Sequence, residues 1–479
     1  MFKKSQTIYM IGIKGVGMAT LAQFLKAGGA LVSGSDVAET FMTDKILARL
    51  KIKVKTPFSS KNLPLDASLI IYSIAYNPAN NSELKFIKDN PELFKKARIL
   101  TYSEALGELF SSHQGIAVCG SHGKTTVSAW LGYVLAKSGK RPNVFVGSNV
   151  PQFKGGSLSG SGKIFVSEAD EYGDKLQYLN PYGVVLNNID YDHPDFFKTE
   201  ADYLQVFSKF VKRIPVAGFL VTNNCDALSR KIKKYCRAQI INYDVADDNY
   251  NNATVNYLAH GLRIKNGYQY FFVNNLGEFK IRLWGKHNIF NALAVIAAAR
   301  ELGVSLAGLK KYLFDFRGTE RRAQILGKYQ GALIIDDYAH HPTEIIATLE
   351  GIRRHYPDKK LRVIFHPHTF TRTKALFNDF VASFGSAQEL IILDIYGSAR
   401  EQQGGVSSAQ LVKAIQKFNK QHAISQPVSN LKNIAQTVDY LCTNVQKGDL
   451  IILMGAGDVF RVGEELLCKK SKPKQLKKK

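Results

Sequence analysis

Residues 116–130 combine an apolar strand, a glycine-rich turn with one lysine, and the start of a helix. They read Ile116-Ala-Val-Cys-Gly-Ser-His-Gly-Lys-Thr-Thr-Val-Ser-Ala-Trp130. Glycines in such a turn let backbone N–H groups approach an anion, and the helix N-terminus adds a partial positive charge. The common P-loop pattern has a further glycine where Val118 stands, but the strand, the turn and the hydroxyl pair all agree. We therefore predict that this turn binds nucleotide phosphates.

The lysine and the two threonines of this turn have different predicted roles. Lys124 supplies a point charge for the β- and γ-phosphates of ATP, and Thr125 or Thr126 could ligate Mg²⁺. The predicted ATP-binding residues of the turn are Gly120, Ser121, His122, Gly123, Lys124, Thr125 and Thr126.

Two acidic loops follow strands in the same part of the chain. Residues 167–171 read Ser-Glu-Ala-Asp-Glu, and residues 187–195 contain three aspartates and one histidine. Carboxylates at strand ends beside a phosphate loop are where Mg²⁺ is held, because this ion prefers oxygen ligands and substrate phosphates. We predict Glu168 and His193 as metal ligands.

A second glycine turn lies near the N-terminus. Gly12-Ile-Lys-Gly-Val-Gly17 follows a strand and opens a helix, and Asp36 ends the next strand about 20 residues later, as in dinucleotide-binding units. The glycine order differs from the dinucleotide fingerprint, so a nicotinamide cofactor is not the first choice. The same close backbone approach suits a diphosphate ligand with one ribose.

The elements that position these turns alternate between short apolar strands and amphipathic helices. This alternation predicts an α/β fold with parallel sheets. A chain of 479 residues exceeds what one hydrophobic core serves, so we predict three domains. Their predicted limits are residues 1–108, 109–318 and 319–468, followed by a disordered basic tail at 469–479.

Composition favours a cytoplasmic protein. The chain is 45% hydrophobic and 22% charged, and its N-terminus has no signal-peptide pattern. No apolar run approaches the ~20 residues of a membrane span, so none is expected. Its five cysteines are odd in number and widely spaced, which argues against a disulfide framework or a zinc site.

The formal net charge of +24 raises the question of nucleic-acid binding. Seven lysines fall within the last eleven residues, 469–479, and the rest of the excess is scattered. We therefore expect no specific nucleic-acid partner, with weak attraction of the tail to RNA or anionic surfaces as the minority interpretation.

Across nearly its whole length the sequence resembles the Mur ligase family. The segments that carry the resemblance, in chain order, are Gly12–Gly17 with Ser33–Asp36, Gly120–Thr126, Glu168–Glu171, Asp192–Asp195, Lys286–Ala292, Gly318–Arg322, Asp336–Glu344 and His366–Thr373. The resemblance implies a Rossmann-like N-terminal domain that binds UDP-sugar, a central P-loop-type ATPase domain, and a Rossmann-like C-terminal domain that receives the amino acid.

The implied activity is ATP-dependent ligation of an amino acid to the lactyl carboxylate of UDP-N-acetylmuramate, through an acyl phosphate, in peptidoglycan synthesis. ATP and Mg²⁺ are the implied cofactors, and a monomer or homodimer is expected. The implied ligands are Thr125 and Glu168 at a first metal site and His193 at a second. The implied catalytic residues are Lys124, His193, His340 and Arg372. Further ATP contacts are implied for Asn288, Asn291, Arg322 and Asp337. The implied UDP-sugar contacts are Gly12, Gly15, Val16, Gly17, Ser35, Asp36 and Ser73.

The amino-acid contacts implied by the resemblance are Tyr338, His340 and Arg372. Family members that use L-alanine have Pro-His-Arg-Phe-Thr-Arg-Thr, whereas Thr369 replaces the first arginine here. The acidic loops look more like the members that attach a preformed L-Ala-γ-D-Glu-diaminopimelate tripeptide, whereas residues 370–373 favour L-alanine. Both acceptors stay open, and a nicotinamide-dependent oxidoreductase is a more distant alternative.

Overall fold

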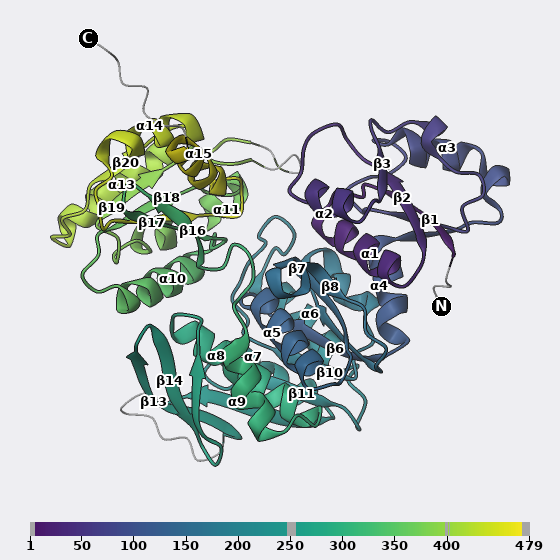
Figure 1. Ribbon diagram of the computed structural model, residues 1–479, viewed down its shortest axis with the longest axis horizontal. Helices are drawn as coiled ribbons and strands as arrows, with labels where there is room; N and C mark the ends of the chain where they lie inside the picture. Colours follow the sequence, from purple (N-terminus) through teal and green to yellow (C-terminus); the bar gives the residue numbers. More distant parts are fainter. Residues whose placement is uncertain (1–4, 247–254, 398–400, 402, 472–479) are drawn as a thin grey trace, which may run out of the picture.

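The computed structural model describes residues 5–246, 255–397, 401 and 403–471. Figure 1 shows three parts that follow one another along the chain, from purple through teal to yellow, each built around its own sheet. The fold is α/β with mostly parallel strands, as predicted.

The N-terminal sheet has five parallel strands in the order β3-β2-β1-β4-β5. This order, which extends in both directions from β1, is that of a doubly wound nucleotide-binding unit. The strands are β1 (Thr7–Ile11), β2 (Leu31–Ser35), β3 (Lys53–Lys55), β4 (Leu69–Tyr72) and β5 (Arg98–Thr101). The helices are α1 (Val16–Ala27), α2 (Asp44–Arg49), α3 (Ser82–Asp89) and α4 (Tyr102–Ser111).

The middle sheet has ten strands in the order β15-β14-β13-β12-β11-β10-β6-β9-β7-β8. Its strands are β6 (Gln114–Cys119), β7 (Asn143–Val150), β8 (Gly155–Leu158), β9 (Ile164–Glu168), β10 (Gly183–Leu186), β11 (Phe219–Asn223), β12 (Gln239–Val245), β13 (Tyr257–Lys265), β14 (Tyr268–Val273) and β15 (Gly277–Ile281). Its helices are α5 (Lys124–Lys137), α6 (Glu200–Val211), α7 (Ala227–Ile232), α8 (Lys286–Glu301) and α9 (Leu306–Asp315). The strands from β12 to β9 are parallel, so their carboxyl ends meet at one edge.

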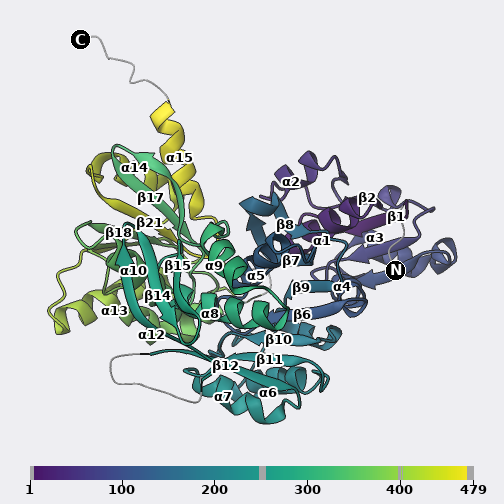
Figure 2. The same cartoon turned by 60° about the horizontal axis from the view of Figure 1, so that its bottom comes forward.

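The C-terminal sheet has six strands in the order β16-β17-β21-β18-β19-β20, and only the β16–β17 pair is antiparallel. The strands are β16 (Gln324–Tyr329), β17 (Ala332–Asp337), β18 (Leu361–Phe365), β19 (Glu389–Ile392), β20 (Val428–Asn430) and β21 (Leu450–Met454). The helices are α10 (Pro342–His355), α11 (Phe370–Ala375), α12 (Phe377–Ala382), α13 (Ser408–Gln421), α14 (Ile434–Asn444) and α15 (Phe460–Ser471). Helix α10 lies on the side of this domain that faces α8 (Figures 1 and 2).

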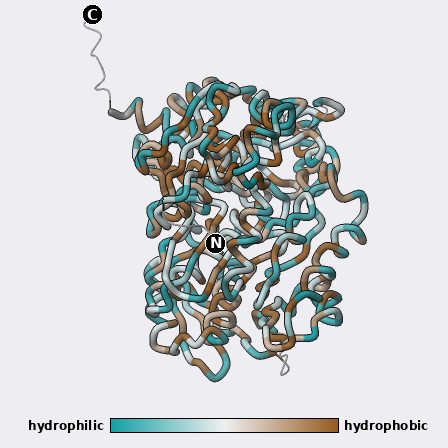
Figure 3. The backbone as a smooth tube through the Cα atoms, turned by 90° about the vertical axis from the view of Figure 1, so that its right-hand side faces the viewer, coloured by the Kyte–Doolittle hydropathy of each residue, from teal (hydrophilic) through white to brown (hydrophobic). Residues whose placement is uncertain are grey.

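Helices α5 and α8 pack together in the middle domain and are buried on almost every side. Residues Ala292–Ala299 are fully buried, as expected for a helix that is apolar all round. Trp130 of α5 stacks on Phe316 with ring centroids 5.4 Å apart. Hydrophobic stretches occur in all parts of the tube in Figure 3, and one buried cluster is shared by the N-terminal and middle domains. The phosphate turn therefore starts from a rigid support.

One predicted domain limit falls inside a helix, and the other falls between two elements. Residue 108 lies inside α4, so the first predicted boundary cuts this helix, whereas residue 318 lies between α9 and β16. The predicted disordered tail begins too early, because α15 continues to Ser471 and Lys469 forms an ion pair with Asp439 at 3.2 Å. Residues 472–479 lie outside the described residues. Within the described chain, no helix combines the length and apolarity needed to cross a membrane.

Candidate active site

The turn between β6 and α5 requires glycine at two positions. Gly120 has φ +118°, and a Cβ atom there would lie 2.5 Å from the carbonyl oxygen of Asn188. Gly123, at φ +79°, would place a Cβ 2.6 Å from the Asn291 side-chain oxygen. Such contacts are too short for a side chain, so only glycine keeps this tight turn at the N-terminus of α5. The geometry suits the close approach of a phosphate.

Lys124 occupies the first turn of α5, one position before the predicted helix start. Its Nζ lies 3.0 Å from a carboxylate oxygen of Glu171 and donates to the carbonyls of Gly120 and Ser121 at 2.5 and 3.1 Å. Burial alone would lower the pKa of Lys124, but the carboxylates of Glu171 and Asp170 outweigh it and raise the pKa above its ordinary value. The side chain is therefore a fixed positive charge.

Thr125 and Glu168, both predicted metal ligands, lie side by side. The Thr125 hydroxyl donates to one Glu168 oxygen at 2.8 Å, and the backbone N–H of Gly147 donates to the other at 2.7 Å. The third predicted ligand, His193, which the resemblance assigns to a second metal site, has its Nε2 3.8 Å from a Glu171 oxygen.

A second group of possible metal ligands contains Asp170, Glu171 and His193. One ligand atom from each lies within 4.8 Å of the others. Two carboxylates and an imidazole at the edge of a phosphate site form a donor set that fits a divalent cation. Asp170 and Glu171 were not among the predicted ligands, although both stand in the acidic loop that drew attention to Glu168.

Two cavities flank the phosphate turn. The first, of about 640 Å³, reaches His122, Gly123 and Thr126 in the turn. The second, of about 390 Å³, reaches Lys124 and also Glu168. The turn therefore lies between two spaces, and its lysine faces the second one.

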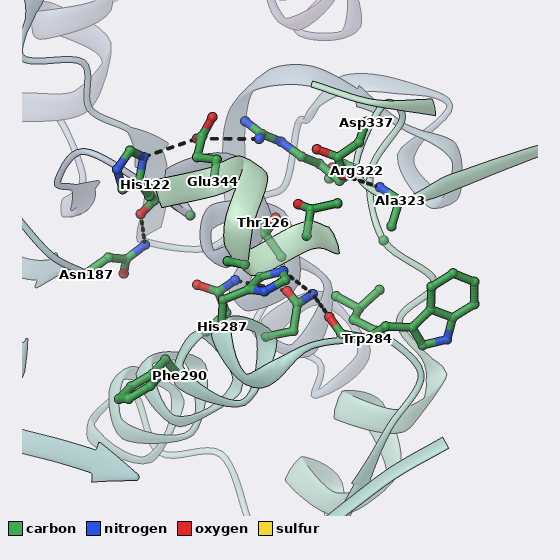
Figure 4. Close-up of a pocket in the computed structure, with 18 of the residues that line it drawn as sticks. His122, Thr126, Asn187, Trp284, His287, Phe290, Arg322, Ala323, Asp337 and Glu344 are labelled. Atoms are coloured by element: carbon green, nitrogen blue, oxygen red, sulfur yellow. Dashed lines mark hydrogen bonds and ion pairs between the residues drawn. The ribbon is translucent and has the colours of Figure 1, made fainter. Parts of the chain in front are cut away.

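The first cavity is enclosed by the middle and C-terminal domains together (Figure 4). It brings together all four of the predicted ATP contacts outside the turn, namely Asn288, Asn291, Arg322 and Asp337. Asn291 donates to the Asn288 side-chain oxygen at 3.0 Å, and backbone N–H groups of Ala323 and Ala339 donate to Asp337 at 2.7 and 2.8 Å. These bonds fix the polar groups before any ligand enters.

The second cavity is enclosed by the N-terminal and middle domains. Of the predicted UDP-sugar residues, it is lined by Gly15, Val16, Gly17 and Ser73. Gly12, Ser35 and Asp36 do not line it. The Ser35 hydroxyl donates to Glu83 at 2.5 Å, and Asp36 accepts the N–H of Val37 in its own loop at 2.8 Å and the N–H of Lys14 in the glycine turn at 2.6 Å. Ser35 and Asp36 therefore bond to neighbouring parts of the N-terminal domain and do not face the second cavity.

The predicted amino-acid residues lie where the C-terminal domain meets the acidic loop. Arg372 donates through Nε and Nη2 to Asp192 at 3.1 and 3.3 Å, and both side chains are buried. Tyr338 and His340 pack edge to face, with ring centroids 5.3 Å apart. Burial, reinforced by the charge of Arg372, lowers the pKa of His340 to about 3. The imidazole of His340 is therefore neutral at neutral pH.

Three α/β domains, with a glycine turn between two interdomain cavities, have the arrangement of an enzyme that brings a nucleotide to a second substrate. Family comparisons cover all three domains. The N-terminal part, residues 7–114, matches the Mur ligase family catalytic domain, residues 118–299 match the Mur ligase middle domain, and residues 321–457 match the Mur ligase glutamate ligase domain.

Individual relatives extend over nearly the whole chain. The chain is 37% identical to UDP-N-acetylmuramate–L-alanine ligase of Desulfitobacterium hafniense, covering 96% of this chain and 99% of the relative. It is 34% identical to the enzyme of the same name from Aquifex aeolicus, covering 97% and 98%. Among solved structures, UDP-N-acetylmuramate-alanine ligase from Thermotoga maritima superposes with a TM-score of 0.77 at 22% identity, covering 97% and 99%. The chain belongs to the Mur ligase family.

Proposed function

We propose that the protein is an ATP-dependent ligase that joins L-alanine to UDP-N-acetylmuramate in peptidoglycan synthesis. Relatives that are 33–37% identical over nearly the entire chain have this activity as their name. The observation that carries the proposal is the position of the turn from Gly120 to Thr126 between two cavities, which we assign to ATP and to the sugar nucleotide. The remaining assignments below rest on this arrangement.

The reaction needs an activated carboxylate, because a carboxylate does not react with an amine at neutral pH. The lactyl carboxylate of UDP-N-acetylmuramate attacks the γ-phosphorus of ATP, which gives an acyl phosphate and ADP. The amine of L-alanine then attacks the acyl carbon, and inorganic phosphate leaves from the tetrahedral intermediate. Phosphoryl transfer of this kind depends mainly on positioning and on charge stabilisation.

Lys124 is the residue that we assign to the phosphates. Its ammonium pairs with Glu171, so a phosphate that enters the site meets a positive charge that is already in place. The N–H groups of the turn from Gly120 to Thr126 would bind further phosphate oxygens. A divalent cation such as Mg²⁺, bound by Asp170, Glu171 and His193 or by Thr125 and Glu168, would supply additional positive charge.

The C-terminal domain is assigned to the amino acid. Arg372 uses Nε and Nη2 in its ion pair with Asp192, and we assign its Nη1 group to the carboxylate of L-alanine. His340 lies 3.0 Å from the Tyr338 carbonyl through Nδ1, which leaves Nε2 as its acceptor nitrogen. Because the pKa of His340 is about 3, this side chain orients the amine as an acceptor and does not store its proton.

Phosphate release from ATP tests the proposal. The purified protein is mixed with Mg²⁺ and UDP-N-acetylmuramate, and L-alanine, L-serine, glycine or the L-Ala-γ-D-Glu-diaminopimelate tripeptide is added. Stimulation by L-alanine is expected and would show that Thr369 is tolerated. Stimulation by the tripeptide alone would instead identify a recycling ligase, and silence with every acceptor would contradict the ligase assignment.

We also propose that the enzyme works in the cytoplasm, where ATP and UDP-sugars are available, as a monomer or homodimer. Light scattering after size exclusion measures the mass directly against the 53.3 kDa of one chain. A larger assembly would contradict the second part of this proposal.

A further inference from the structure

His122 stands in the phosphate turn, but its side chain points to another domain. The imidazole Nε2 lies 2.9 Å from Asp190, in the loop after β10, and Nδ1 lies 3.2 Å from Glu344, in the first turn of α10. Asp190 belongs to the middle domain and Glu344 to the C-terminal domain. His122 therefore connects the phosphate turn to both.

Both nitrogens of His122 face a carboxylate. A neutral imidazole has one N–H and could satisfy one of the two, whereas an imidazolium donates to both. Burial alone would lower the pKa of His122, but the bonds to Asp190 and Glu344 outweigh it and raise the pKa to about 9. The side chain is thus a second fixed cation in the turn, and its charge is directed at carboxylates of the protein.

Glu344 extends this connection toward both substrates. One of its oxygens accepts from His122 and lies 3.8 Å from the Arg322 guanidinium, as the dashed lines in Figure 4 show. The other oxygen accepts the backbone N–H of His340 at 3.1 Å. One carboxylate therefore joins the phosphate turn to an assigned ATP contact and to an assigned amino-acid contact.

The backbone of His122 is held independently of its side chain. Its N–H donates to the Asn188 side chain at 2.8 Å, and its carbonyl accepts from Asn187 at 3.2 Å. The turn can therefore keep its shape when the imidazole is replaced. This separation makes the interdomain contact testable without dismantling the phosphate site.

We propose that His122 is a positioning residue whose bridge to Glu344 aligns Arg322 and His340 with the phosphate turn. The inference rests on the proposed function and deepens it. Occupancy of the turn by ATP is then coupled to the placement of the amino-acid contacts on the other domain. The coupling is carried by a charge-assisted bridge, which is stronger than a bond between neutral groups.

Kinetics of the full-length enzyme test this role. In His122→Asn, the one side-chain amide cannot donate to Asp190 and Glu344 at the same time. We therefore expect kcat/KM for ATP to fall by about 10- to 100-fold, the range expected for loss of a charged hydrogen bond. KM for L-alanine should rise as well, although His122 is not assigned to the amino acid. Glu344→Gln should produce the same two changes.

Two comparisons separate positioning from loss of packing. Thr343→Val removes the 2.7 Å bond from Thr343 to Asp190 in the same interface but leaves the His122–Glu344 bridge, and its KM for L-alanine should stay within about threefold of wild type. The double variant His122→Asn/Glu344→Gln should be no worse than the poorer single variant. Additive losses, or an unchanged KM for L-alanine in His122→Asn, would overturn the proposal.

ATP binding by calorimetry keeps this inference separate from the ligase assignment. Wild-type protein that binds ATP but ligates none of the acceptors would contradict the proposed function. The double-variant comparison can then be made on the ATP dissociation constant alone. Equal ATP affinity of wild type, His122→Asn and Glu344→Gln would in that case count against the bridge.

Discussion

Lys124 and His122 are two cations in one short turn, and their different ion-pair partners give them different roles. Lys124 pairs with Glu171 inside the middle domain, whereas His122 pairs with Glu344 of the C-terminal domain. The charge of Lys124 is therefore available to a phosphate at the site, and that of His122 is committed to the interface. Substitution of Lys124 and substitution of His122 should therefore have different effects on the enzyme.

Lys124→Ala should reduce the rate of ATP-dependent product formation by at least about 100-fold, because it removes a fixed charge where negative charge accumulates. Circular dichroism should show that the variant remains folded. Lys137→Ala is a suitable control, since Lys137 is an exposed lysine at the other end of the same helix and lines neither cavity. Persistent activity of Lys124→Ala would remove this turn from the phosphate site.

The bridge of His122 predicts a pH dependence of stability. The pKa of His122 is raised from 6.5 to about 9 on folding, so its contribution is complete below pH 6.5 and is lost as the pH rises through 9. The facing groups stay constant in this window: Asp190 and Glu344 have lowered pKa values and remain ionised, and burial lowers the pKa of His341, which remains neutral.

Chemical unfolding of wild type and His122→Asn between pH 6.5 and 10 measures this contribution. The difference in unfolding free energy should be largest at pH 6.5 and should shrink steadily toward pH 10. A difference that is independent of pH would mean that His122 is not protonated in the folded protein.

At the scale of elements, the strand–turn–helix unit of β6 and α5 depends on backbone shape. In Gly120→Ala, the new Cβ atom would clash with the Asn188 backbone, which cannot move aside as a side chain would. Alanine is also unfavourable at the positive φ of this position. We expect a loss of stability of about 3 kcal/mol, together with weaker ATP binding. Thermal unfolding and calorimetry measure both.

Gly139 offers a matched control at the other end of α5. Its φ is +77°, but a Cβ atom there has nothing within 4 Å. Gly139→Ala should therefore cost only the backbone term, about 1 kcal/mol, and should leave ATP binding unchanged. Equal costs at the two positions would show that space in the turn is not limiting.

This unit could be predicted from the sequence because its information is local. Glycine spacing, an apolar strand and a following helix are contained in residues 116–130, and the predicted helix start near Thr125 differs from the observed one by one residue. The partner of His122 is 222 residues away in the sequence, and no spacing rule reaches that far. Glu344 therefore had no predicted role.

The local sequence pattern also could not predict the direction in which individual side chains point. Ser35 stands at a strand end, as predicted, but successive side chains of a strand face opposite ways and its hydroxyl meets Glu83. The acidic loop was recognised, yet the fold determines that Glu171, and not Glu168, pairs with Lys124. Predictions of which segments form the site were thus more accurate than predictions of which atoms meet.

At the scale of the whole molecule, Arg372 and Asp192 form a buried ion pair between the middle and C-terminal domains. Asp192→Asn would leave a buried guanidinium without its counter-charge, at a cost of about 3 to 5 kcal/mol. We expect a lower unfolding temperature for the C-terminal domain and a higher KM for L-alanine. Differential scanning calorimetry and the phosphate assay measure these effects.

Asp195→Asn is the control for this change. Asp195 lies in the same loop but accepts an exposed hydrogen bond from Tyr172. Its replacement should alter stability by no more than about 0.5 kcal/mol. If both asparagine variants behave alike, the ion pair does not hold the domains together.

The C-terminal domain is joined to the middle domain by one short connection, residues 316–323, between α9 and β16. Such a tether keeps the two facing surfaces at an effective concentration on the order of millimolar, so contacts too weak to hold separate proteins can hold these domains. The His122 bridge and the Arg372–Asp192 pair therefore need to resist only an intramolecular separation.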